Sequence, residues 1–208
     1  MRRLVPLRAL ETALSRAQEE LPTTHSELRH FATEQQGRAI AEAALLSPWD
    51  TLGIDWSQYH PDARKLLDDP FFWDAVDEYS PHGNDTGADL LEAFRDWRRR
   101  HRTVPASRFL PLMLKRWNYS SSVASLLDKP MSAWDDDDEL ILEVIDEANI
   151  AIAFAQLKIE GRCDDDLREA ALASIQRQLD PAMHAHFAWT PPMEHRDRLE
   201  QLRAKLLR

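Results

Sequence analysis

The chain has 208 residues and a formal net charge of −10 at pH 7, and 43% of its residues are hydrophobic. This length is sufficient for a substantial hydrophobic core, and the hydrophobic content is too high for a disordered chain. Its five glycines are too few for a β-rich fold with many tight turns or for a glycine-lined phosphate loop. The single cysteine, Cys163, excludes an intramolecular disulfide and zinc sites built from several thiolates.

Apolar residues recur at helical spacing through almost the whole chain, beginning near its first residues. The pattern predicts two helices at the start. The second of them begins near Thr24, whose spacing to Glu27 is that of a capping box. We expect these two helices to form a hairpin within residues 1–46 that packs on residues 49–208.

Shorter helices are predicted in the next part of the chain, where proline and glycine interrupt the apolar pattern. The strongest loop signal is residues 80–87, a segment that holds two of the five glycines. The helices expected here cover residues 61–67, 70–79, 85–101, 107–117 and 120–128.

The longest helix is predicted over residues 138–160. Its apolar positions, among them Ile145 and Ile152, cover most of the helix circumference, and such a helix is usually central in a bundle. Further helices are predicted at 164–179 and 192–207. We therefore predict an all-α fold in which all 208 residues form a single domain, a multi-helix bundle of about eight to ten helices around the central helix.

We expect neither a signal peptide nor a membrane-spanning segment. The first residues are basic, but Arg8 and Glu11 interrupt the apolar core that a signal peptide requires. The longest nearly apolar stretch, residues 148–157, is about half as long as a bilayer-spanning helix. These features predict a cytoplasmic protein.

The loop at residues 80–87 is the best place in the sequence for a polar site. It contains His82, Asn84 and Asp85. Histidine titrates near neutral pH, so His82 could act as a general base oriented by a carboxylate. The same residues have the composition of a helix cap preceded by a glycine turn. The sequence leaves both interpretations open.

Charge is distributed in blocks along the chain. Residues 49–94 carry a net charge of −9, residues 95–133 carry +7, and residues 134–180 carry −10. A basic block between two acidic ones is expected to be matched within the fold or by a partner. We expect the basic cluster at 95–102 to pair with acids of the flanking blocks, because the overall negative charge argues against binding to nucleic acid.

A tryptophan and four consecutive aspartates precede the longest predicted helix. Four carboxylates exceed what the dipole of a helix N-terminus requires, and tryptophan beside charge is typical of binding hot spots. We expect this acidic run to dock a protein partner with a basic surface. The run consists of Trp134, Asp135, Asp136, Asp137 and Asp138.

We expect no metal ion, no cofactor and no catalytic residue. Glu27 and His30 form the only Glu-x-x-His pair, whereas a di-metal helical bundle needs two. His184 and His186 are two residues apart and would not share a helix face. The sequence contains no phosphate loop, dinucleotide fingerprint, His-Glu-x-x-His motif or Gly-x-Ser-x-Gly elbow.

Arg95 and His101 have the Arg-x(4–6)-His spacing that is also found in the helical HEPN ribonucleases. A true resemblance would imply a metal-independent ribonuclease in which both side chains position the scissile phosphate. About two such spacings are expected by chance in a chain of this composition, and two occur. The spacing therefore does not assign the chain to that family.

The sequence favours a non-catalytic cytoplasmic protein that binds a basic protein partner through an acidic surface. Bacterial immunity proteins and antitoxins that neutralise basic toxins share this profile of charge and size, which is an analogy. The alternative is a helical hydrolase or metal-independent ribonuclease that uses His82 and Asp85, or Arg95 and His101. A third interpretation is a structural homodimer with complementary charged faces.

Overall fold

The fold was obtained as a computed structural model. The residues that the structure describes are 47–119, 126–127 and 129–208. The chain divides into two compact units, residues 1–51 and residues 52–208. In the first unit the described part contains one short helix, α3 (Pro48–Thr51). The hairpin expected at residues 1–46 lies outside the described residues, so its packing on the rest of the chain stays a prediction.

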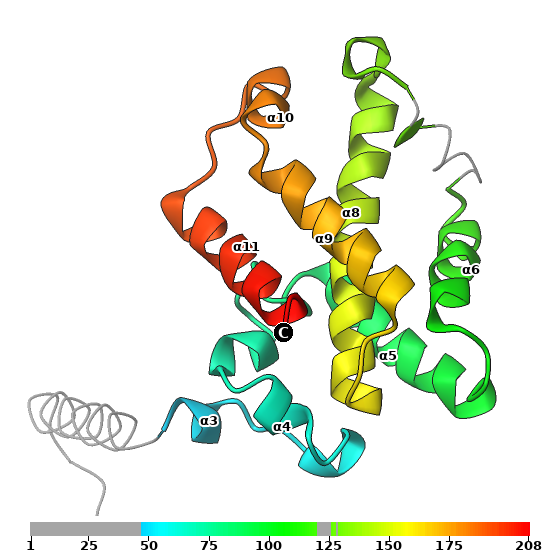
Figure 1. Cartoon of the computed structure of the whole chain (residues 1–208), viewed down its shortest axis with the longest axis vertical. Helices are drawn as coiled ribbons and strands as arrows, with labels where there is room; N and C mark the ends of the chain where they lie inside the picture. Colours follow the sequence, from blue (N-terminus) through cyan, green and yellow to red (C-terminus); the bar gives the residue numbers. More distant parts are fainter. Residues whose placement is uncertain (1–46, 120–125, 128) are drawn as a thin grey trace, which may run out of the picture. The chain divides into compact units, whose positions relative to one another are not determined.

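Within the described residues, all regular secondary structure is helical, which confirms the predicted all-α fold (Figure 1). Short 3-10 turns occur at Trp56–Gln58, Pro70–Trp73, Ala106–Arg108 and Met131–Ala133. The α-helices of the second unit are α4 (Ala63–Leu66), α5 (Asp85–Arg100), α6 (Phe109–Arg116), α8 (Asp136–Glu160), α9 (Asp165–Leu179), α10 (Pro181–His186) and α11 (Met193–Leu206).

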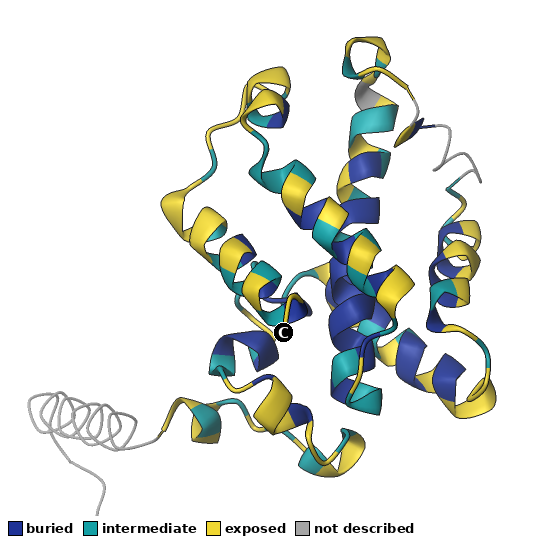
Figure 2. Ribbon diagram, viewed as in Figure 1, coloured by how far each residue is buried: buried dark blue, intermediate teal, exposed yellow. Residues whose placement is uncertain are grey.

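Helix α8 is the centre of the second unit, as the sequence predicted. It contacts α4, α5, α6 and α9, and α9 in turn contacts α10 and α11. Every residue from Ile150 to Gln156 is buried, whereas the N-terminal turns of α8 are partly exposed (Figure 2). A capping box between Asp135 and Asp138 begins the helix, and Gly161 ends it in the left-handed region at φ 68°.

The prediction of a helix over residues 70–79 is wrong. A 3-10 turn forms at Pro70–Trp73, and an irregular loop follows up to α5. The side chains of Asp69, Asp74 and Asp77 each accept a hydrogen bond from the backbone N–H two residues further on. These local bonds compete with the helical pattern, so the loop prevails.

Other predicted boundaries shift for similar local reasons. The short helix expected at 61–67 covers only Ala63–Leu66. The helix expected from residue 107 begins at Phe109, because a 3-10 turn occupies the three preceding residues. Of the helix expected at 120–128, only Leu126 and Leu127 are described, and both are helical.

The loop before α5 is held against the first turns of that helix. Asn84 caps α5 by accepting a hydrogen bond of 2.7 Å from the backbone N–H of Gly87. A side chain at position 87 would overlap the carbonyl oxygen of Pro81, so glycine is required for this close approach. Asn84 is therefore the N-cap residue of α5.

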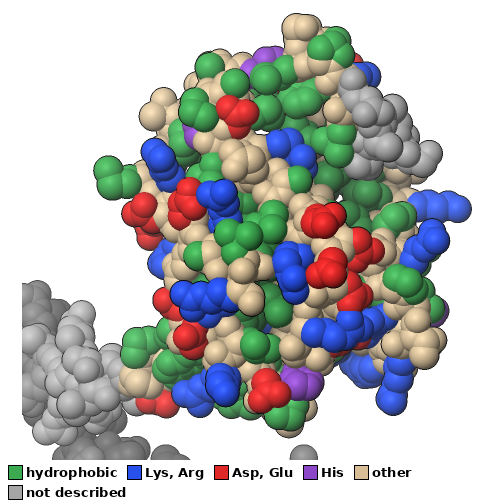
Figure 3. Space-filling view, in the orientation of Figure 1, with side chains coloured by type: hydrophobic (Ala, Val, Ile, Leu, Met, Phe, Trp, Pro, Cys, Tyr) green, Lys and Arg blue, Asp and Glu red, His purple; other side chains and the backbone are tan. Residues whose placement is uncertain are grey.

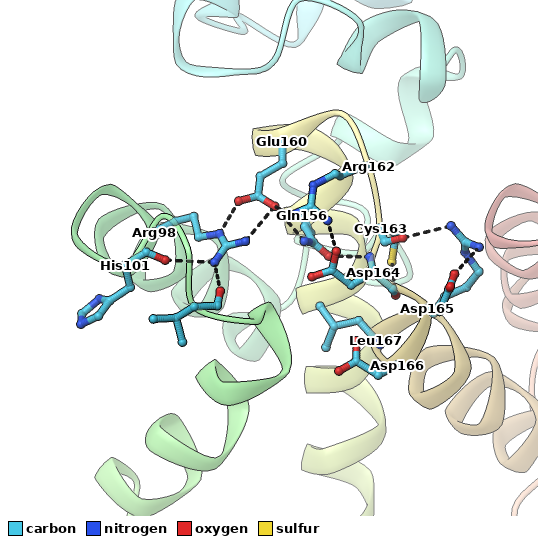
Figure 4. Close-up of polar contacts among 12 residues, drawn as sticks. Arg98, His101, Gln156, Glu160, Arg162, Cys163, Asp164, Asp165, Asp166 and Leu167 are labelled. Carbon is cyan, nitrogen blue, oxygen red and sulfur yellow. Dashed lines mark hydrogen bonds and ion pairs between the residues drawn. The ribbon is translucent and has the colours of Figure 1, made fainter.

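The arginines predicted to be paired within the fold include Arg98, which is buried and ion-paired with Glu160 at the end of α8 (Figure 4). Arg98 also donates to the carbonyl oxygens of His101, at 3.0 Å, and Val104. Burial alone would raise the pKa of Glu160, but hydrogen bonds from Arg98 and Gln156 outweigh it and lower that pKa. The network thus joins α5 to α8.

Arg95 also follows the expectation, because its Nη1 lies 2.5 Å from Glu92 of the preceding acidic block. Arg99 pairs instead with Asp96, which belongs to the same basic block. In the face shown by Figure 3, acidic and basic side chains are interspersed. The block pattern of the sequence is therefore largely dispersed by folding on this face.

We predict that Ile152→Asp unfolds the protein, because Ile152 is fully buried and an unpaired buried charge costs several kcal/mol. A typical domain has only about 5–15 kcal/mol of stability. Leu140→Asp, at a position of α8 that is 54% exposed, is the matched control. Circular dichroism melting curves check this, and equal melting temperatures for the two variants would refute the placement of Ile152.

We also predict that Arg98→Ala lowers the free energy of unfolding by about 3–5 kcal/mol, because it leaves the carboxylate of Glu160 without its buried partner. Arg99→Ala removes an ion pair whose side chains are 68% and 60% exposed, so its effect should stay below about 1 kcal/mol. Urea denaturation of both variants measures the difference. Similar losses would mean that the buried pair adds nothing beyond a surface pair.

Candidate functional site

A cavity of about 760 Å³ lies among α8, α9, α10, α11 and the loop before α5. The N-terminal half of α8 forms one wall, and residues from α10, α11 and the segment between them form another. We call this cavity the acidic cleft. The lining residues used below are Glu78, Tyr79, Glu139, Glu143, Glu147, His184, Trp189 and His195.

A sharp change of chain direction places α10 and α11 beside α8. Asp180 accepts a hydrogen bond from the backbone N–H of Ala182, and Pro181 occupies the first turn of α10. After α10, Ala188 adopts a left-handed conformation with φ 50°, and Pro192 directly precedes α11. These local signals return the chain toward the cleft.

The α8 wall of the cleft is a stripe of carboxylates. Glu139, Glu143 and Glu147 are spaced four residues apart, so they follow one face of the helix. Burial raises the pKa of Glu147 against the opposing effect of a hydrogen bond with Thr86, and the negative charge of Glu143 raises it further. Asn84 donates a hydrogen bond of 3.3 Å to Glu147. Within the described part of the chain, neither Glu143 nor Glu147 forms an ion pair with a basic side chain.

The opposite wall is a row of rings. His195 stacks on Tyr79, with ring centroids 5.0 Å apart and an angle of 10° between the planes. Trp189 lies 5.1 Å from His195 and meets His184 edge-on at 5.5 Å. The side chain of Trp189 is 41% exposed. The row therefore gives the cleft an aromatic surface that solvent reaches.

His195 has an unusual environment. Burial lowers its pKa, and the nearby His184 adds to the effect. Its Nδ1 is buried and has no hydrogen-bond partner among the described residues. His195 is thus neutral at pH 7 and keeps one ring nitrogen without a partner in the described structure.

The arginines of the cleft are already engaged within the fold. Arg177 binds the buried carboxylate of Asp146 through two of its nitrogens. Burial raises the pKa of Asp146, against the opposing effect of Arg177. Arg198 lies 3.2 Å from Asp77 and covers the ring of Phe71 at 4.3 Å. The carboxylates that remain give the cleft its negative character.

The predicted acidic run lies at the start of α8, directly before the first carboxylate of the cleft. Asp135 and Asp138 form the capping box, and Asp138 also pairs with Lys129 at 2.7 Å. Asp137 is exposed. The side chain of Asp136 lies outside the described residues. Two of the four aspartates therefore have a structural role, and docking by the run stays a prediction.

Trp134 is partly buried. Its ring meets His186 edge-on at 5.8 Å, and its Nε1 is buried without a hydrogen-bond partner among the described residues. His186 in turn lies 2.9 Å from Glu139. Trp134 thus helps to anchor α10 beside the start of α8, in addition to any contact with a partner.

The loop candidates are not brought together as a catalytic group. His82 is buried, with Nε2 3.0 Å from the carbonyl oxygen of Ala151 and Nδ1 2.8 Å from Nζ of Lys158. Both ring nitrogens therefore have partners in the core. Asp85 is exposed in the first turn of α5, and Asn84 is the one loop candidate that lines the cleft.

Arg95 and His101 do not line the cleft either. Arg95 lies over the ring of Tyr59 at 5.2 Å, whereas His101 stacks on Trp97 at 5.1 Å. His101 follows the last residue of α5 as its C-cap and is not part of the helix, so the two side chains have different surroundings. The structure gives this pair no shared site.

A buried basic cluster of Lys158, His82 and Arg95 was missed by sequence reasoning. Lys158 is only 2% exposed, and its ammonium group lies 4.8 Å from the ring centre of Trp73. Burial and, secondarily, the charge of Arg95 lower the pKa of Lys158 to about 7. Burial also lowers the pKa of His82 well below its usual value. The sequence signal that could have indicated this cluster was a lysine within the most apolar predicted helix.

The spacing of Glu139, Glu143 and Glu147 was also visible in the sequence and was overlooked. No sequence signal pairs Tyr79 with His195, because more than a hundred residues separate them. Their contact depends on the packing of α11 against α9 and the loop before α5.

The described residues contain no group of three or more histidine, cysteine, aspartate or glutamate side chains that could hold a metal ion. His184 and His186 have different partners, the carbonyl oxygen of Gln178 and the carboxylate of Glu139. Glu27 and His30 lie outside the described residues. No helix in the described ranges combines the length and apolar character needed to cross a membrane.

Among curated proteins, the chain is similar to the uncharacterized protein YfeS of Escherichia coli strain K12, with 25% identity over 130 residues. The match covers 62% of this chain and 53% of YfeS, so the chain spans about half the length of that relative. No family model and no solved structure matches the chain.

We predict that stability rises with pH between about 7 and 10 because of Lys158. In this window the unfolded lysine is protonated, whereas the folded one, with a pKa of about 7, is neutral. Below pH 7 both states carry the charge, and its burial then costs at most about 5 kcal/mol. Lys158→Met should be more stable than wild type at pH 7 and should lose most of this pH dependence.

Urea denaturation at pH 7, 8 and 9 measures the free energy of unfolding of both proteins. Lys115→Met, at an exposed lysine of α6, is the control for loss of a lysine. Parallel curves for wild type and Lys158→Met would contradict the low pKa of Lys158.

Proposed function

We propose that the protein is a non-catalytic binding protein whose acidic cleft receives a basic segment of a partner protein. One observation carries the proposal. Glu78, Glu143 and Glu147 line a cavity with an aromatic wall, and within the described residues none of them forms an ion pair. A basic partner would supply the missing charges, and it would relieve the repulsion between Glu143 and Glu147.

The contents of the cleft favour binding over catalysis. Ser80 is the hydroxyl candidate for a nucleophile, but it is buried and donates a hydrogen bond of 2.5 Å to the carbonyl oxygen of Asp74. Arg177 and Asp146 bind each other, so neither group is available to a reacting substrate. His195 is the one observation that favours a hydrolase as the second candidate.

The acidic run adds to the proposal through its position. Asp135 to Asp138 precede the carboxylate stripe on the same helix, so they extend the negative potential along α8. Long-range attraction of this kind acts mainly on the rate of association. A basic toxin has the required partner chemistry, in which case the protein would be a bacterial immunity protein or antitoxin of the cytoplasm. Charge and size support that specific assignment.

The test begins with affinity capture from the native organism and then measures binding of the captured partner to variants. Glu143→Gln combined with Glu147→Gln should weaken affinity at least about tenfold, which corresponds to about 1.4 kcal/mol. Asp136→Asn combined with Asp137→Asn should mainly slow association at low salt. Biolayer interferometry separates the two rates.

The matched control combines Asp89→Asn with Glu169→Gln, which removes two exposed charges outside the cleft. This control should bind within about twofold of wild type if the cleft is the site. Unchanged affinity in the Glu143/Glu147 variant, with a wild-type melting temperature, would reject the cleft as the binding site.

A further inference from the structure

We propose that the group recognised in the acidic cleft is the guanidinium of an arginine side chain, held between Glu143 and Glu147 on one side and the ring row of Tyr79, Trp189 and His195 on the other. This inference rests on the proposed function and specifies its ligand. It assigns the cleft a chemical preference among cations in place of a general attraction to positive charge.

The carboxylates fit a forked donor. Glu143 and Glu147 lie one helical turn apart on the same face of α8, at the spacing where two side chains are neighbours. A guanidinium presents five N–H donors in a planar fork, so one group can serve both carboxylates. An ammonium group is a single compact charge with no preferred plane.

The ring row favours a flat and weakly hydrated cation. Tyr79 and His195 stack on each other, and Trp189 beside them has a partly exposed ring on which a flat cation can stack. A guanidinium stacks on aromatic faces. It is more weakly hydrated than an ammonium, so its transfer out of water costs less free energy. On the α8 wall, burial already raises the pKa of Glu147, so the cleft disfavours strongly hydrated groups.

The protein itself contains a similar arrangement beside the same cavity, whose lining includes Arg198. The guanidinium of Arg198 lies over the ring of Phe71 at 4.3 Å while it pairs with Asp77 at 3.2 Å. Arg177 binds Asp146 through two nitrogens in another part of the lining. Guanidinium between carboxylate and ring is therefore a contact that this local environment already stabilises.

The experiment uses the full chain labelled with ¹⁵N and three acetylated tripeptide amides, Gly-X-Gly, in which X is arginine, lysine or citrulline. Citrulline keeps the shape of arginine and lacks its charge. We expect the arginine peptide to shift the indole signal of Trp189, assigned with Trp189→Phe, and to bind at least fivefold more tightly than the lysine peptide. Citrulline should cause no saturable shift.

The variant Glu143→Gln/Glu147→Gln should bind the arginine peptide at least tenfold more weakly than wild type. The matched Asp89→Asn/Glu169→Gln variant should bind it with unchanged affinity. Melting temperatures establish that both variants are folded. Equal affinities for arginine and lysine peptides would overturn the guanidinium preference. A trimethyllysine peptide that binds more tightly than the arginine peptide would also overturn it, because the cleft would then prefer an alkylated ammonium group.

The outcomes separate this inference from the proposed function. If the captured partner depends on Glu143 and Glu147 but no arginine peptide binds at millimolar concentration, the function stands and the inference fails. If the arginine peptide binds in the cleft while the captured partner is insensitive to both glutamates, the inference stands and the cleft serves a small guanidinium ligand.

Discussion

The burial of α8 is the constraint on which the rest of the second unit depends. A helix that is buried over all its residues from Ile150 to Gln156 must be covered on every side, and α4, α5, α6 and α9 supply that cover. The polar groups that α8 takes into the interior then need partners from other elements. Arg177 of α9 pairs with Asp146, and Arg98 of α5 pairs with Glu160.

The acidic cleft exists because the elements that surround the C-terminal half of α8 do not surround its N-terminal turns. In the N-terminal half of α8 only part of the circumference is buried, through residues such as Leu142 and Ile145. The glutamates at positions 139, 143 and 147 line the cavity together with residues of α10 and α11. The ring wall is set by the turn at Ala188 and by the packing of α11 on α9. One continuous helix therefore provides the core at one end and an acidic wall at the other.

The buried Lys158 shows how the same constraint shapes the loop before α5. Its amine needs a hydrogen-bond partner within the core, and His82 provides one from a segment 76 residues away in sequence. The histidine that appeared to be a candidate base is thereby fixed as part of the interior. Burial lowers the pKa of His82 well below its usual value and that of Lys158 to about 7, because among the described residues their charged neighbours are basic.

Periodicity and capping residues were sufficient to predict the all-α class, the central helix and the long helices α5, α9 and α11. Their apolar faces and end signals are local properties of the sequence. The helix expected at 70–79 failed because aspartate side chains bind the backbone N–H groups two residues ahead of them. These side-chain hydrogen bonds are also local, but a hydropathy pattern contains no information about them.

The charge blocks predicted internal pairing but could not assign partners, because the pairing of Arg98 with Glu160 spans 62 residues. The acidic run was recognised from the sequence, whereas the cleft beside it was not. The sequence by itself, through its composition and periodicity, determined that the protein is helical, acidic and built around one apolar helix. Only the tertiary structure decided which carboxylates face a cavity and which rings oppose them, since that depends on contacts between residues distant in sequence, such as Tyr79 and His195.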